Sequence, residues 1–286
     1  FLESSASVPG STLHLVVTPA KVLGSNDAAA LFVPSTESVN KIYIAIEEIL
    51  SWLTIERYSY QMQLSRLDLC RNVGLQDQRY IDAYIRLLKK GSSATGWKVQ
   101  SYPEGDERNA HSFRRISRYY QVTVYDKLYQ IKREGYHTDY DGTRRILRVE
   151  VSILRPGIQE ELSRCKANID DRWPYQLLEL AANGVSTMRR VLRRLVSDMP
   201  YYTLSAIREY LGTTDISNAK RKNLLDFLEK INRYDLLDKK RIKEKFENGK
   251  KRLKQLKKLG INPVTIEARA GIPYLPSLEQ LIAAGL

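Results

Sequence analysis

Hydrophobic residues recur at two different spacings in the first part of the chain. Steps of three and four, typical of an amphipathic helix, run through 39–53 behind the capping pair Ser35-Thr36, and again through 77–90 ahead of Gly91. Alternating apolar and polar positions predict strands in five segments: 13–17, 62–69, 96–102, 119–128 and 145–154. The segment 132–143, rich in Gly, Asp and Tyr, predicts a hairpin loop between the last two strands.

After Pro156 the spacing is helical throughout. It predicts helices at 158–167, 174–182, 187–197 and 203–210, then a long basic helix at 224–259 that Gly260 ends. This order favours an α+β fold, in which a central, mainly antiparallel sheet carries helices on one face and precedes a basic helical C-terminal region. We expect one domain at 1–168 and an accessory region at 169–286, with residues missing before Phe1.

Positive charge is concentrated near the end of the chain. The formal net charge is +13, and the stretch 220–258 holds 16 Lys and Arg against 6 Asp and Glu. Such a stretch favours a polyanionic partner, so we interpret Lys240, Arg241, Lys251 and Arg252 as contacts to DNA phosphates. A solvated helix face explains the same run equally well. The tail 262–286 has the pattern of a small helix-turn-helix-like unit.

Several classes of protein are excluded by what the sequence lacks. Its longest apolar run, near 42–53, is broken by Glu47 and Glu48, so we expect no membrane span. Cys70 and Cys165 lie far apart without neighbouring His or Cys, which argues against a disulfide framework and structural zinc and favours a reducing compartment. No His-hydrophobic-His pair occurs, so the commonest class of relaxase is also excluded.

Strand alternation collects polar side chains on one face of the predicted sheet. If the strands are neighbours, that face carries His14, Arg66, Asp68, Tyr125, Lys127, Arg148 and Glu150. An ordinary solvated sheet face also has polar residues at alternate positions, so the polar residues of any one strand do not by themselves indicate a functional site. Tyr119, Tyr120 and Tyr129 compete with Tyr125 as chemically active phenols.

Together these residue types suit one reaction. A phenol ionises near pH 10 and is a weak nucleophile at neutral pH. Two carboxylates, Asp68 and Glu150, with His14 as an optional third ligand, could hold Mg²⁺ or Mn²⁺, which would polarise a phosphodiester. Lys127 or an arginine could favour the phenolate of Tyr125 and offset developing charge.

Four motifs in order resemble those of the replication initiators of filamentous phages, the gene II or CRI type, which are related to plasmid Rep_trans rolling-circle initiators. The resemblance covers about residues 13–155 and, more loosely, 252–286. The motifs are Thr18-Pro19-Ala20-Lys21-Val22-Leu23, Ser65-Arg66-Leu67-Asp68, the strand ending Val124-Tyr125-Asp126-Lys127, and Arg148-Val149-Glu150. The family's strand before Thr18-Pro19 carries a glutamate where this chain has His14, which leaves the third metal ligand open.

The resemblance implies a metal-dependent DNA-nicking endonuclease and strand transferase in the cytoplasm of a bacterial host. Tyr125 would form a 5′-phosphotyrosyl intermediate at the origin, with Lys127 assisting, Asp68, Glu150 and His14 binding Mg²⁺ or Mn²⁺, and Arg66 and Arg148 contacting DNA. The implied partners are origin DNA, single-stranded or supercoiled, and a host helicase and polymerase.

Two other classes of function remain open. A non-enzymatic, helix-turn-helix-like DNA-binding initiator would make Tyr125, Asp68 and Glu150 ordinary sheet residues. An RNA-binding protein could use exposed sheet tyrosines for stacking, although the aromatic-rich strand motif of such folds is missing. Covalent, metal-dependent attachment to DNA distinguishes the nickase from both.

Overall fold

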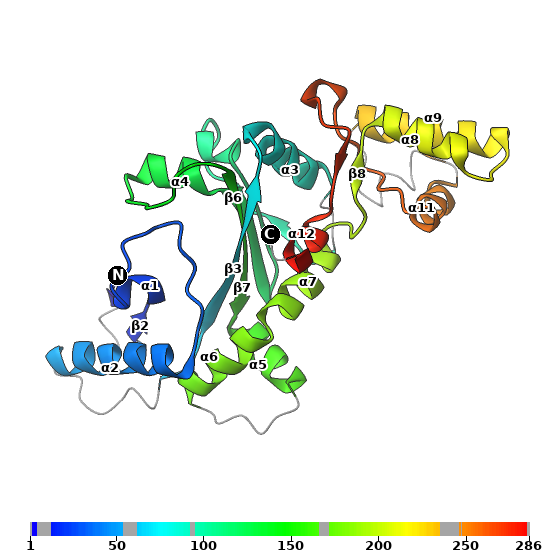
Figure 1. The fold of residues 1–286 in the computed structure, drawn as a ribbon. Coiled ribbons are helices and arrows are strands. Elements are labelled where there is room, and N and C mark those ends of the chain that lie inside the picture. Colours follow the sequence, from blue (N-terminus) through cyan, green and yellow to red (C-terminus); the bar gives the residue numbers. More distant parts are fainter. Residues whose placement is uncertain are drawn as a thin grey trace.

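A five-stranded antiparallel sheet with the strand order β3-β7-β6-β5-β4 lies at the centre of the computed structural model (Figure 1). The structure describes residues 2–4, 13–53, 62–91, 95–165, 172–234, 246 and 248–284. The sheet strands are β3 (Arg66–Leu75), β4 (Lys98–Val99), β5 (Ser112–Ile116), β6 (Tyr120–Asp126) and β7 (Arg145–Leu154). Helices cover one face of this sheet, so the predicted α+β fold is confirmed.

The central strand β7 explains the two different faces of the sheet. Its odd-numbered residues Leu147, Val149, Val151 and Ile153 are fully buried, while Arg148 and Glu150 point the other way. The helices on the apolar face are α3 (Gln78–Gly91), α5 (Arg155–Arg164), α7 (Gly184–Leu195) and α12 (Leu278–Ala284). Their apolar side chains join those of the strands in one core.

The N-terminal segment forms a separate layer beside the sheet. β1 (Leu2–Ser4) pairs with β2 (Leu13–Leu15), followed by α1 (Pro19–Val22) and α2 (Thr36–Trp52). Ser35 and Ser38 form a reciprocal capping box at the start of α2, as the Ser35-Thr36 pair predicts. The buried face of α2 packs against Trp173 at the start of α6 (Trp173–Ala182).

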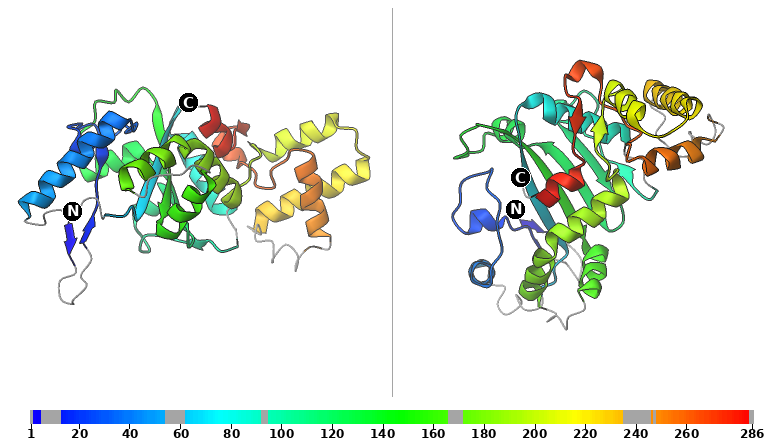
Figure 2. Two further views of the ribbon diagram at one scale, coloured as in Figure 1. Left: turned by 90° about the horizontal axis from the view of Figure 1, so that it is seen from below. Right: turned by 45° about the vertical axis from the view of Figure 1, so that its right-hand side comes forward.

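A smaller helical unit with its own core stands beside the sheet, in yellow and orange in Figure 2. It consists of α8 (Leu204–Thr213), α9 (Asn218–Tyr234) and α11 (Gly249–Lys258). The short strands β8 (Tyr201–Tyr202) and β9 (Tyr274–Leu275) pair where the chain enters and leaves this unit. The described residues include no helix long and apolar enough to cross a membrane.

The hydrophobic cores do not divide at residue 168, where we expected the domain boundary. Leu180 of α6, Val191 of α7 and Leu278 of α12 belong to the core of the sheet. The helical unit with a separate core begins only after β8. The C-terminal end of the chain therefore returns to the first domain.

Three local predictions are wrong. The long helix at 224–259 is interrupted, because Asn248 adopts a left-handed conformation (φ 59°) and α11 begins afresh at Gly249. Helix α4 (Lys127–Glu134), which Asp126 caps, replaces the end of the predicted strand 119–128 and the start of the predicted hairpin loop 132–143. The tail is not helix-turn-helix-like, because a short 3₁₀ turn (Ala268–Ala270) and β9 precede its one described α-helix, which packs on α7.

Candidate active site

Tyr125 and Glu150 meet on the polar face of the sheet. The hydroxyl of Tyr125 on β6 donates a 2.6 Å hydrogen bond to Oε1 of Glu150 on β7. In the strand register Tyr125 faces Arg148 and Glu150 faces Thr123, so the bond crosses the β6–β7 pair diagonally. A carboxylate that accepts this hydrogen bond is placed to receive the phenolic proton.

The environment of Tyr125 keeps its phenol neutral. Burial raises the pKa of Tyr125, and the negative charge of Glu150 raises it further, while Arg148 acts in the opposite direction. The phenol would therefore ionise only when positive charge is added nearby or when Glu150 takes its proton.

Lys127 lies beside this phenol as the first residue of α4, since β6 ends at Asp126 and not at Leu128. Its buried ammonium lies 6.0 Å from the centre of the Tyr125 ring and donates to Gln130. Burial, and secondarily the charge of Arg148, lower the pKa of Lys127 to about 8. The Lys127 side chain is therefore a cation at neutral pH and loses its proton only slightly above it.

Asp68 shares the polar face with Glu150. It pairs with Ser152 across the β3–β7 ladder, which makes Asp68 and Glu150 diagonal neighbours. Arg66 binds both oxygens of Asp68, at 2.7 and 3.0 Å, and donates to Ser152. The pKa of Arg66 is raised, first by the hydrogen bond to Asp68, because this bond and the charges of Asp68 and Glu150 outweigh burial. The two carboxylates thus already attract a positive charge.

These two carboxylates fit a divalent cation, but His14 is not brought to them. Mg²⁺ in phosphoryl-transfer sites takes one or two carboxylates and completes its shell with water and phosphate oxygens. The exposed His14 lies on β2, which pairs with β1 and not with the central sheet. In the described part of the chain no three His, Cys, Asp or Glu side chains gather as a metal-holding group.

Arg148 is placed differently from our expectation of a DNA contact. It is only 7% exposed, and its guanidinium donates to Asn72 Oδ1 and to the backbone oxygen of Ala29, both at 2.7 Å. Asn72 also donates to Ala29. Arg148 therefore fixes the loop before α2 to the polar face, and the burial of its guanidinium leaves little of it for phosphate.

The predicted contacts in the basic region have mixed outcomes. Lys240 and Arg241 lie outside the described residues. Lys251 is exposed on α11, whereas Arg252 lies over the ring of Phe227, 5.5 Å from its centre. Arg252 thus packs within its own helical unit.

Sequence reasoning missed three members of the polar face. Cys70 and Asn72 share the face of Asp68, because β3 continues to Leu75 and beyond the predicted end at Leu69. Burial and, next, the charge of Glu150 raise the pKa of the Cys70 thiol to about 12. Arg114 comes from β5, which the sequence did not predict, and its buried Nε has no hydrogen-bond partner among the described residues. Continued alternation past Leu69 was the available signal for Cys70 and Asn72.

Comparison of the chain with known proteins found no matching family model, no matching curated protein and no matching solved structure.

Proposed function

We propose that this chain is a rolling-circle replication initiator that nicks and rejoins a DNA strand at an origin, with Tyr125 as nucleophile. The observation that carries the proposal is the 2.6 Å hydrogen bond from the Tyr125 hydroxyl to Glu150 on the polar sheet face. It supplies a nucleophile and a proton acceptor in contact, as covalent catalysis requires. The motif resemblance supplies the substrate class.

In this reaction Glu150 accepts the phenolic proton as the Tyr125 oxygen attacks phosphorus. A bond forms between that oxygen and phosphorus, and the bond from phosphorus to the 3′ oxygen breaks. The 3′ oxygen takes a proton from solvent, and the 5′ phosphate stays on Tyr125. Rejoining reverses these steps with an incoming 3′ hydroxyl.

Cationic side chains around the phenol support the same reaction. Lys127 lies over the Tyr125 ring. Arg114 pairs with Thr123, two residue pairs along the β5–β6 ladder from Tyr125, and its Nε has no hydrogen-bond partner among the described residues. Such groups stabilise charge on the pentacovalent phosphorus. Mg²⁺ or Mn²⁺ held by Asp68 and Glu150 would polarise the phosphodiester and lower the pKa of the phenol.

The test is covalent capture of origin DNA. We expect wild-type protein with Mg²⁺ or Mn²⁺ to form a denaturation-resistant adduct, EDTA and Tyr125→Phe to abolish it, and the matched control Tyr120→Phe to retain it. Host helicase and polymerase would then act on the nicked origin. If wild type protects the origin in footprinting but forms no adduct with metal, the nickase proposal is wrong.

The alternative function is a DNA-binding initiator without nicking activity. Its specific support is the bidentate pairing of Arg66 with Asp68, which is also typical of an ordinary sheet ladder. The footprint without adduct described above is the result that this alternative predicts.

A further inference from the structure

A cleft of about 940 Å³ opens where the central sheet meets the C-terminal helical unit. Its walls come from four parts of the chain: the end of α3 with residues 95–97, the turn between β5 and β6, the end of α7 with the segment that follows it, and α11 with residues 262–264. None of these walls carries Tyr125, Asp68 or Glu150, so the cleft is distinct from the candidate active site.

Cations dominate the charge of this cleft. Arg118, Arg194 and Lys257 line it, all three are exposed, and none pairs with a carboxylate in the described part of the chain. Arg193 also lines it but is bound to Glu279 at 2.7 Å. The lining residues include one acid, Asp198. Unpaired cations facing a common space repel one another, and a polyanion in the cleft would remove this repulsion.

Aromatic rings accompany the cations. Trp97 and Tyr119 line the cleft, and both are partly exposed. The guanidinium of Arg118 lies 5.5 Å from the centre of the Tyr119 ring. Cations that follow a phosphate backbone, together with rings on which bases stack, are the combination that binds single-stranded nucleic acid. Paired bases of a duplex would not expose their faces to these rings.

We propose that this cleft binds single-stranded DNA, with Arg118, Arg194 and Lys257 on the phosphates and Trp97 stacked on a base. The choice of DNA over RNA rests on the proposed function. The assignment of a single-stranded nucleic acid rests on the cations and rings of the cleft alone. Pocket volumes of 300–1,000 Å³ are typical of sites for whole small ligands, so about 940 Å³ leaves room for more than one nucleotide.

The experiment measures binding without cleavage. Tyr125→Phe protein in EDTA is titrated with a labelled oligothymidylate of about 12 nucleotides, within the range of single-strand site sizes. The cleft variant Arg118→Ala/Arg194→Ala/Lys257→Ala is compared with a control of equal charge change, Arg86→Ala/Arg145→Ala/Lys132→Ala, whose exposed cations lie outside the cleft and outside the basic stretch 220–258. Thermal unfolding confirms that both variants fold.

We expect the cleft variant to bind roughly 10-fold or more weakly and the control to bind within about 2-fold of the parent, with a smaller salt dependence only in the cleft variant. Tryptophan fluorescence should be quenched on binding, and Trp97→Phe should remove this quenching while retaining most of the affinity, unlike Trp97→Ala.

Equal losses in the cleft and control variants would overturn the proposal, as would quenching that persists in Trp97→Phe. Duplex DNA or RNA of the same length binding as tightly as the single strand would overturn the assignment to single-stranded DNA. Because no nick is formed in this experiment, failure of the cleft proposal is distinguishable from failure of the proposed nickase.

Discussion

Tyr120 and Tyr125 lie at the two ends of β6 and point to opposite faces of the sheet. Tyr120 faces Ile153 in the core, whereas Tyr125 faces Arg148 on the polar side. The hydroxyl of each donates to a glutamate, Glu161 for Tyr120 and Glu150 for Tyr125. Similar hydrogen bonds therefore occur in two different settings, one inside the core and one on the polar face.

We expect Phe substitutions of these two tyrosines to have opposite consequences. Tyr120→Phe removes a donor from buried Glu161, which should cost about 1–3 kcal/mol of unfolding free energy and leave adduct formation intact. Tyr125→Phe should abolish the adduct and cost less than about 1 kcal/mol, because Glu150 is partly exposed. Urea unfolding and denaturing gels measure the two effects. Retention of the adduct in Tyr125→Phe would show that another residue is the nucleophile.

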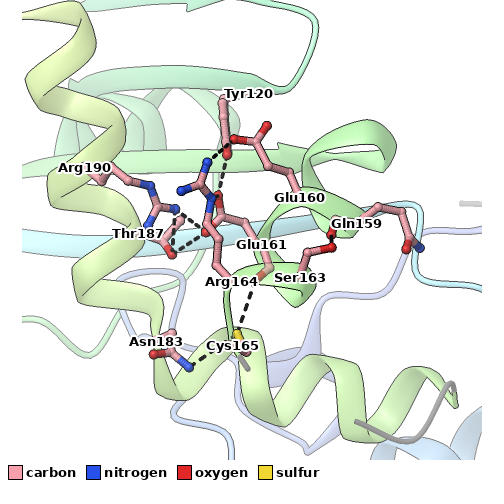
Figure 3. A network of polar contacts seen from close by, with 10 residues as sticks. All are labelled: Tyr120, Gln159, Glu160, Glu161, Ser163, Arg164, Cys165, Asn183, Thr187 and Arg190. Carbon is pink, nitrogen blue, oxygen red and sulfur yellow. Dashed lines mark hydrogen bonds and ion pairs between the residues drawn. The ribbon is translucent and has the colours of Figure 1, made fainter. Parts of the chain in front are cut away.

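Glu161 joins α5 to β6 and α7 (Figure 3). This residue is 3% exposed and accepts hydrogen bonds from Tyr120, Thr187 and Arg190. We expect Glu161→Ala to cost roughly 3–5 kcal/mol, because it leaves Arg190 partly buried without its partner. Partly exposed Glu160 is a control on the same helix, since Glu160→Ala breaks its pairing with Arg164 and should cost about 1 kcal/mol or less. Equal losses in chemical unfolding would contradict this interpretation.

The same network should make stability depend on acid pH. Burial alone would raise the pKa of Glu161, but the hydrogen bonds from Tyr120 and Arg190 lower it below its ordinary 4.5. A lowered folded-state pKa stabilises the protein above about 4.5, and this contribution disappears as the pH falls through the lowered value. We expect the melting temperature of wild type to fall more steeply in this range than that of Glu161→Gln. Parallel curves would refute the assignment.

Lys127 should produce a falling limb in the pH profile of nicking. Its pKa of about 8 means that the ammonium beside Tyr125 loses its charge as the pH rises through that value. We expect single-turnover adduct formation to decline above about pH 8 in wild type. Lys127→Arg should retain the cation and shift the decline upward, whereas Lys127→Met should be slow throughout. An unshifted limb in Lys127→Arg would assign the titration to another group.

Arg66 should compete with a divalent cation for Asp68. Because its guanidinium binds both oxygens of Asp68, we expect Arg66→Gln to bind Mn²⁺ several-fold more tightly than wild type, as measured by electron paramagnetic resonance. Asp68→Asn should weaken binding, and Arg71→Gln on the same strand should leave it unchanged. Unaltered affinity in Arg66→Gln would show that Asp68 does not hold the metal.

Where apolar and polar residues alternate regularly, the sequence predicts which side chains lie on the polar face of the sheet. Apolar residues at helical spacing likewise predict most of the helices. The predicted strand 145–154 agrees with β7, because its apolar residues fill every second position. Strand β5 escaped prediction because Arg114 and Arg115 are adjacent, which breaks the alternation around Phe113. Helix α4 escaped because its buried face consists of Lys127 and Ile131.

Contacts between distant segments were not encoded in any local pattern. His14 alternates correctly within its strand, but nothing in that strand says that its partner is β1. Arg148 likewise alternates with apolar neighbours, yet its burial depends on the backbone oxygen of Ala29, far away in sequence. The cleft was equally hidden, since its four walls come from separate parts of the chain.

Strand β6 gives the two proposed DNA sites a fixed spacing. Tyr120 at its first end lines the cleft, and Tyr125 near its other end is the proposed nucleophile. Five residues of extended chain separate their Cα atoms by about 16 Å. Hydrogen bonds to β5 and β7 on both sides prevent this strand from stretching. If one DNA strand occupies both sites, the length of β6 fixes the distance between them, and the cut would fall at a constant number of nucleotides from the segment bound in the cleft.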